Sequence, residues 1–134
     1  MKLRVVIDSN IYVSAIIFGG TPKSLLALAE LGRFEICISS TIRQEVERTL
    51  RRKFGWSEED VALGCAPLWA IAHDVETHSY LNVTDDPDDN RILECAVEGK
   101  AQVIVTGDDD LLRLKTFQGI EILKPRTFLN RYEP

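Results

Sequence analysis

The sequence predicts an α/β fold, a three-layer α/β/α sandwich around a mainly parallel sheet of about five strands. Short apolar runs typical of buried strands alternate along the chain with segments of helical periodicity. The 134 residues contain no internal repeat, linker or low-complexity tract. We therefore expect one domain over residues 1–134, with its functional groups beyond the carboxyl ends of the parallel strands.

The predicted elements follow from the spacing of apolar residues. Continuous apolar runs indicate strands covered on both faces, and apolar residues three and four apart indicate helices. The expected order is strand 3–7, helix 11–18, helix 21–32, strand 34–39, helix 40–54, helix 57–69, strand 72–75, helix 88–99, strand 103–105, a short helix at 111–112, strand 120–123 and helix 125–132.

Several helix ends carry specific signals. Gly19-Gly20 ends the first helix, and Pro22 lies near the first turn of the second, where proline is well tolerated. Thr41 with Gln44 fits a capping box at the start of the third helix. Pro67 makes the end of the fourth helix uncertain, because proline disrupts a helix interior.

Charge and cysteine content bear on the class of protein. The net charge of -5 and the pI near 5.0 differ from those of most nucleic-acid binders, which present a basic face. Two bound divalent ions would add +4 and take -5 to -1, and helix 40–54 carries a basic stretch, so charge alone does not decide the partner. Three scattered cysteines favour free thiols in a reducing cytosol over disulfides or a zinc site. With no apolar run long enough to span a bilayer, we expect a cytoplasmic protein without a membrane partner.

Acidic residues recur where predicted strands end. Asp8 directly follows the first strand, and the run Asp108-Asp109-Asp110 follows strand 103–105. Carboxylates that meet at one edge of a sheet repel each other unless a cation, most often a divalent metal, holds them together. Asp108 and Asp110 both lie within reach of such a metal, and Asn10 and Thr106 are expected to add polar groups beside it. Because Asp is also a common N-cap, a capping role for Asp8 stays open.

Helical phase distinguishes Glu45 from the other acids of its helix. Glu45 shares a face with Ile42 and Thr49, at the edge of the buried stripe, whereas Glu47 points outward. A carboxylate in that place needs a partner, so a salt bridge to a nearby arginine is the alternative to a metal. Basic residues on the same helix, Arg43, Arg48 and Arg52, are expected to contact substrate phosphates, with a solvated face as the alternative.

The same reasoning selects Asp89 from the acidic stretch at residues 85–89. Asp89 precedes two apolar residues by three and four positions, which aligns it with the inward face of helix 88–99. Asp85 and Asp86 fit a simpler role as negative charge at a helix N-terminus. Asp86 and Asp88 stay open as outer-shell groups of the site.

The order of these motifs resembles the PIN-domain ribonucleases, most closely the branch of toxin components of toxin–antitoxin pairs. The motifs that carry the resemblance are Asp8-Ser9-Asn10 with Val13-Ser14-Ala15, Ser39 and Glu45, Asp89-Asn90-Arg91-Ile92-Leu93-Glu94-Cys95-Ala96, and Thr106-Gly107-Asp108-Asp109-Asp110-Leu111. The resemblance covers residue 3 to about residue 128. It implies a Rossmann-like fold, dependence on Mg²⁺ or Mn²⁺, endonucleolytic cleavage of RNA, a homodimer and a small antitoxin partner.

Carried over residue by residue, the acidic quartet of the family falls on Asp8, Glu45, Asp89 and Asp108, with Asp110 close by. Asp8, Asp89 and Asp108 are then expected metal ligands, and Glu45 a ligand or a base that orients water. The small polar position of the family falls on Asn10 or Thr106. The alternative function is a catalytically silent module of the same fold that binds RNA or protein, and its expected signature is a loss of acids.

Overall fold

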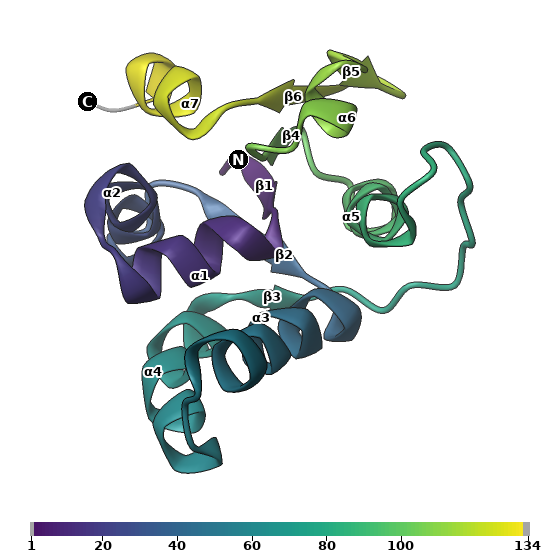
Figure 1. Cartoon of the computed structure of the whole chain (residues 1–134). Helices are drawn as coiled ribbons and strands as arrows, with labels where there is room; N and C mark the ends of the chain where they lie inside the picture. The colour runs from purple at the N-terminus through teal and green to yellow at the C-terminus, as the bar shows by residue number, and fades with distance from the viewer. Residues whose placement is uncertain (1, 133–134) are drawn as a thin grey trace.

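Six strands form one sheet in the order β3-β2-β1-β4-β6-β5 in the computed structural model, which describes residues 2–132 (Figure 1). Every neighbouring pair is parallel except β5 and β6, which are antiparallel. The strands are β1 (Arg4–Ile7), β2 (Glu35–Ile38), β3 (His73–Asp74), β4 (Val103–Val105), β5 (Thr116–Phe117) and β6 (Ile120–Leu123).

Helices cover both faces of this sheet, so the predicted three-layer sandwich is confirmed. One face is covered by α5, which contacts β1, β2 and β4, and the other by α1 and α2, which pack with α7, α3 and α4 (Figure 1). The short α6 packs against β6. The helices are α1 (Ser9–Ile17), α2 (Gly20–Glu30), α3 (Ser40–Phe54), α4 (Glu58–Ile71), α5 (Pro87–Glu98), α6 (Asp109–Leu112) and α7 (Pro125–Tyr132).

The sheet has one strand more than the predicted five, because Thr116–Phe117 forms the short edge strand β5. A tight turn joins it to β6, and Gln118 and Gly119 adopt φ angles of 49° and 80° there. Positive φ at both central residues is the geometry that two-residue hairpin turns favour. Thr116 and Phe117 stand between the polar residues Lys115 and Gln118 and belong to no apolar run, so the sequence gives no strand signal there.

The predicted capping box at Thr41 and Gln44 is wrong. Ser39 caps α3 instead, because its Oγ accepts a hydrogen bond from the Ile42 N–H at 3.3 Å. The helix therefore begins immediately after β2 ends, and Thr41 lies within its first turn. The fourth helix is also longer than expected, since α4 continues through Pro67 to Ile71.

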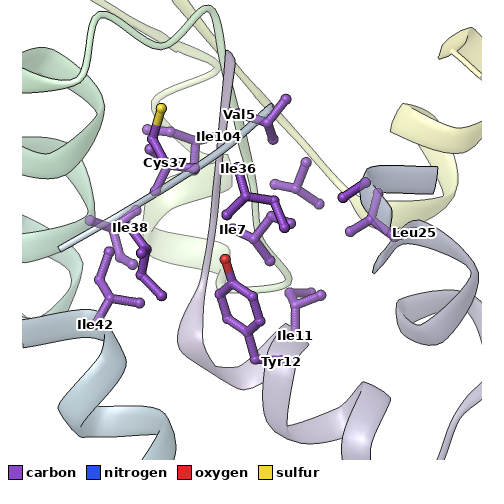
Figure 2. Packing of buried hydrophobic residues seen from close by; sticks show 14 of the residues in the cluster. Val5, Ile7, Ile11, Tyr12, Leu25, Ile36, Cys37, Ile38, Ile42 and Ile104 are labelled. Carbon is purple, nitrogen blue, oxygen red and sulfur yellow. The ribbon is translucent and has the colours of Figure 1, made fainter. Parts of the chain in front are cut away.

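The core lies between the central strands and the helices on both faces of the sheet. Figure 2 shows side chains of β1 and β2 packed with those of α1, α2 and α3. The ring of Tyr12 is fully buried and meets the ring of Trp69 edge-on, with the ring centroids 5.5 Å apart. All three cysteines are buried with free thiols, as predicted.

Strand register sets the position of the polar groups that follow the strands. Ile7 of β1 pairs with Val105 of β4, so the next residues, Asp8 and Thr106, lie beside each other at the carboxyl edge of the sheet. The strands β1 and β4 are central, and the strand order reverses between them, since β2 and β3 follow on one side of β1 and β4 and β6 lie on the other. In parallel sheets such a switch point opens the crevice in which ligands bind.

No single helix within residues 2–132 is long and apolar enough to cross a membrane. The pair α1 and α2 has the necessary length and composition only when taken together, and the two helices are bent by 103° at their junction.

The packing predicts that Ile104→Ala lowers the free energy of unfolding by about 2–5 kcal/mol, because this fully buried side chain lies on the central strand β4. The control is Leu63→Ala, which truncates an exposed side chain of α4 and should change stability by less than about 0.5 kcal/mol. Urea unfolding followed by circular dichroism measures both. Equal losses in the two variants would contradict this description of the core.

Candidate metal centre

Three carboxylates meet at the carboxyl edge of the sheet. One oxygen of each of Asp86, Asp89 and Asp108 lies within 4.8 Å of the other two. Asp86 and Asp89 come from the start of α5, and Asp108 from the turn between β4 and α6. The group therefore joins the layer on one face of the sheet to the end of a central strand.

Backbone N–H groups hold two of these carboxylates in place. Asp86 is the N-cap of α5, and its Oδ1 accepts a hydrogen bond from the Asp88 N–H at 2.9 Å. Asp108 is the N-cap of α6, and its Oδ1 accepts from the N–H groups of Asp110 and Leu111 at 2.8 Å and 3.2 Å. The free N–H groups of a helix start favour a negative charge. Capping therefore fixes both side chains and offsets part of their mutual repulsion.

Asp8 lies beside this group and is tied to it by a chain of hydrogen bonds. The Asp108 N–H donates to Thr106 Oγ1 at 3.0 Å, and the Thr106 hydroxyl donates to Asp8 Oδ2 at 2.6 Å. The Ser9 hydroxyl donates to Asp8 Oδ1 at 3.3 Å. Asp8 is also the N-cap residue of α1; its side chain makes no well-formed capping hydrogen bond, although the Asn10 backbone N–H in the first turn lowers its pKa.

The crowding of acids in this crevice appears in their pKa values. Burial, together with the charges of Asp108, Asp86 and Asp8, raises the pKa of Asp89 to about 7. Burial also raises the pKa of Asp8, although the hydrogen bond from Thr106 opposes this. A carboxylate with a raised pKa is one whose ionised form lacks a counter-charge. The crevice thus favours the binding of a cation.

Glu45 approaches the same crevice from α3. It is half-buried, and burial raises its pKa, as do the charges of Asp88 and Asp8. The Ser9 hydroxyl and the Arg48 guanidinium lower it. Four segments that are distant in the sequence, around residues 8, 45, 86–89 and 106–108, therefore bring acids together.

A divalent cation fits the donor set of this crevice. Asp89 is only 4% exposed, and its Oδ2 is buried without a hydrogen-bond partner in the described part of the chain. An unpartnered buried oxygen is costly, and a cation coordinated by it would remove that cost. Carboxylate oxygens are the ligands that Mg²⁺ and Mn²⁺ prefer. Asp86, Asp89 and Asp108 are therefore suited to hold such an ion.

Two of the predicted residues around the metal site, Asp110 and Asn10, have exposed side chains. Asp110 is exposed and forms an ion pair with Arg113, with Oδ1 and NH1 3.0 Å apart. Asn10 is also exposed, although its backbone N–H lowers the pKa of Asp8.

The three arginines of α3 have different surroundings. Arg43 forms an ion pair with Asp74, and its guanidinium lies 5.3 Å from the centroid of the Trp69 ring. Arg48 and Arg52 are exposed, three and seven positions after Glu45. Because both spacings return to the same side of a helix, these two arginines continue the Glu45 side of α3.

Sequence reasoning assigned Asp86 only a charge or outer-shell role and did not single out Ser9. The Asp86-Pro87 pair is a recognisable helix start, since Pro often occupies the first helical position. The sequence carries no comparable signal that the Asp86 carboxylate turns toward Asp89 and Asp108. Ser9 contacts Asp8 because it follows it directly at the start of α1.

Comparisons with known proteins add a family and a fold. A family model described as PIN domain matches residues 4–110. An uncharacterized protein of Methanocaldococcus jannaschii is 27% identical over 147 aligned positions, which cover 99% of this chain and 94% of that protein. The structure of VapBC2 from Rickettsia felis, bound to a DNA fragment from their promoter, matches with a TM-score of 0.64 at 16% identity. That match covers 90% of this chain and 97% of the other, and it shows a shared fold.

The raised pKa values predict that the metal-free protein becomes less stable as the pH rises from about 4 to about 7. In this window the folded protein binds more protons than the unfolded chain, in which Asp89 titrates near the ordinary aspartate value of 3.8. The free energy of unfolding should therefore fall with increasing pH. Asp89→Asn should make this fall shallower, because it removes the carboxyl group whose pKa is raised to about 7.

Urea unfolding in EDTA at a series of pH values measures this slope for both proteins. Asp109→Asn, at an exposed position, is the control and should keep the wild-type slope. A wild-type stability that is flat or rises with pH, or an equal slope in Asp89→Asn, would show that the acids are not crowded as described.

Proposed function

Because the chain belongs to the PIN domain family, we propose that it is an Mg²⁺- or Mn²⁺-dependent endoribonuclease that hydrolyses RNA phosphodiester bonds. The observation that carries this proposal is the convergence of Asp86, Asp89 and Asp108, with an unpartnered buried oxygen on Asp89. The cytoplasm is its proposed location, in keeping with three buried free thiols.

Asp89 and Asp108 are the proposed metal ligands, with Asp8 completing the site from the end of β1. Thr106 orients Asp8 through its 2.6 Å hydrogen bond, and the α6 backbone orients Asp108. A bound divalent ion would lower the pKa of a water molecule and offset the charge that develops on the phosphate. Asp110, also predicted as a ligand, stays a prediction, and in this structure its carboxylate forms an exposed ion pair with Arg113.

Glu45 is the proposed group that orients the attacking water. Its raised pKa gives it more of the basicity that a proton acceptor needs near neutral pH. Its position on α3 is close enough to Asp8 and Asp88 for their charges to raise its pKa, so it lies beside the proposed metal ligands. Ser9 lies beside both Asp8 and Glu45 and helps to fix their orientation.

Substrate phosphates are proposed to contact Arg48 and Arg52. Both guanidinium groups are exposed on the Glu45 side of α3, so a phosphate backbone that enters the crevice passes close to them. Arg43 is better suited to a structural role, because Asp74 and Trp69 already occupy its guanidinium. Contacts to phosphates are independent of base sequence and weaken with added salt.

We further propose that the protein is the toxin of a toxin–antitoxin pair. The match to VapBC2 is the comparison that supports this partner. A groove of about 380 Å³ between α1, α2 and α4 offers a surface for it, with a mainly apolar lining that includes Ile16, Leu26, Trp56 and Leu68, and with Lys23 and Glu30 among the lining residues. Amphipathic helices dock into grooves of this kind. A homodimer is also predicted. Light scattering of the purified protein would test this oligomeric state.

Asp8→Asn should reduce Mg²⁺-dependent cleavage of a labelled single-stranded RNA about a hundredfold or more, because a metal ligand contributes several kcal/mol to transition-state stabilisation. Asp109→Asn, in the same acidic run as Asp108 but exposed, should cleave at the wild-type rate. Circular dichroism should show both variants folded. Undiminished cleavage by Asp8→Asn contradicts the proposal, and wild-type protein that binds RNA without cleaving it supports the silent module.

Arg52→Gln should raise KM for RNA with little change in kcat, and it should reduce the slope of log affinity against log salt by about 0.7, the value for one phosphate on a single strand. Arg51→Gln removes the same charge from an exposed neighbour that points to a different side of α3, and it should leave the slope closer to that of wild type. Filter binding at several salt concentrations measures the slopes. Equal slopes for Arg52→Gln and wild type would exclude this phosphate contact.

A further inference from the structure

The segment 79–86 carries the chain from the region after β3 to the start of α5, and it contains no strand or helix (Figure 1). It ends at Asp86, the N-cap of α5 and a member of the candidate metal centre. The direction of the Asp86 carboxylate therefore depends on how this segment is held.

Asn90 holds the segment by its backbone. Its Oδ1 accepts hydrogen bonds from the N–H groups of Val83 and Thr84 at 3.0 Å and 2.9 Å, and its Nδ2 donates to the Thr84 carbonyl at 3.0 Å. The side chain is only 3% exposed. Because all three hydrogen bonds of this buried amide go to the backbone of residues 83 and 84, they hold that stretch in a single conformation.

Glu94, one helical turn after Asn90, fixes the earlier part of the segment. Its Oε2 accepts from the Leu81 N–H at 2.7 Å and from Arg91 NH2 at 2.9 Å. The same Arg91 nitrogen donates to the Leu81 carbonyl at 3.1 Å, and its guanidinium lies 4.4 Å from the centroid of the Tyr80 ring. Asn90, Arg91 and Glu94 of α5 therefore bind the segment. Asp89, on the same helix, belongs to the candidate metal centre.

Thr84 passes this constraint to Asp86. Its hydroxyl donates to the Asp86 carbonyl at 3.0 Å and accepts from the Asp86 N–H at 3.3 Å. Asn90 is therefore linked to the backbone of Asp86 through a single intervening residue, Thr84. Every link in the chain from Asn90 to Thr84 to Asp86 is a hydrogen bond between groups of defined direction.

We propose that Asp86 is a further ligand of the metal and that Asn90, through Thr84, is the positioning residue that directs it there. This inference rests on the proposed metal-dependent function, and it concerns an acid beyond the four that the family resemblance assigns. Its basis is the oxygen of Asp86 within 4.8 Å of those of Asp89 and Asp108, together with the buried, unpartnered Oδ2 of Asp89. Without a constraint, repulsion from the other two carboxylates would turn an acid on an irregular segment toward water.

A purely structural role for Asn90 predicts something different. In that case its loss would lower stability, and the affinity for metal would be unchanged in the molecules that stay folded. If Asn90 positions Asp86, the loss of Asn90 or of the Thr84 hydroxyl weakens metal binding in a protein that has Asp86. The same loss has no effect on metal binding once Asp86 is replaced. Residues that orient metal ligands typically change metal affinity by about 10- to 100-fold.

The test is titration of the full-length protein with Mn²⁺, followed by electron paramagnetic resonance, for wild type, Asp86→Asn, Thr84→Val and the double variant. Thr84→Val removes only the hydroxyl and keeps the shape of a half-buried side chain, so it should fold. Asn90→Leu removes all three backbone bonds and is measured in the same way. Asp85→Asn, at an exposed neighbouring acid outside the group of three, is the matched control.

We expect Asp86→Asn and Thr84→Val each to raise the Kd for Mn²⁺ about 10-fold or more, and the double variant to resemble Asp86→Asn alone. Asp85→Asn should bind as wild type does. Additive losses in the double variant, or an unchanged Kd in Asp86→Asn, would overturn the inference. If the variants show the expected Kd values but the wild-type protein with bound Mn²⁺ leaves RNA intact, the role of Asp86 is upheld. The proposed activity is then contradicted.

Discussion

Repulsion among the carboxylates at the ends of the central strands determines how the side chains of this site are held. Asp89 is almost fully buried between two other acids, and its raised pKa reflects the cost of its charge. The fold offsets part of this cost with donors of fixed direction. The N-termini of α5 and α6 bind Asp86 and Asp108, and Thr106 binds Asp8. These donors compensate only part of the negative charge of the carboxylates. A divalent cation would neutralise the rest.

This arrangement explains why the acids come from such different parts of the chain. Parallel pairing of β1 with β4 places Asp8 beside Thr106, and α5, which packs on β1, β2 and β4, brings Asp89 to the same edge. The segment 79–86 then adds Asp86. Its conformation is set by Asn90 and Glu94, two buried polar residues whose side chains bond to its backbone. Buried polar groups of α5 thus serve the site indirectly, by holding the chain that leads into it.

Much of this was predictable from the sequence, because the signals were local. Apolar runs located the central strands, so Asp8 and Asp108 could be placed at one edge, and helical phase set Asp89 and Glu45 apart from their neighbours. The features that escaped prediction depend on contacts between distant residues. The pairing of Arg43 with Asp74 and the direction of the Asp86 carboxylate follow from the folded chain, and neither leaves a periodic pattern. The edge strand β5 was missed because Thr116 and Phe117 belong to no apolar run.

Anomalous diffraction from crystals of the protein grown with Mn²⁺ would locate the metal ion directly. We predict a manganese peak at about 2.0–2.3 Å from carboxylate oxygens of Asp89 and Asp108, with the Asp86 carboxylate in the same coordination shell. The segment 79–86 should keep its hydrogen bonds to Asn90 in that structure. The absence of a peak at this group of acids at saturating Mn²⁺, or a peak coordinated by other residues, would contradict the account.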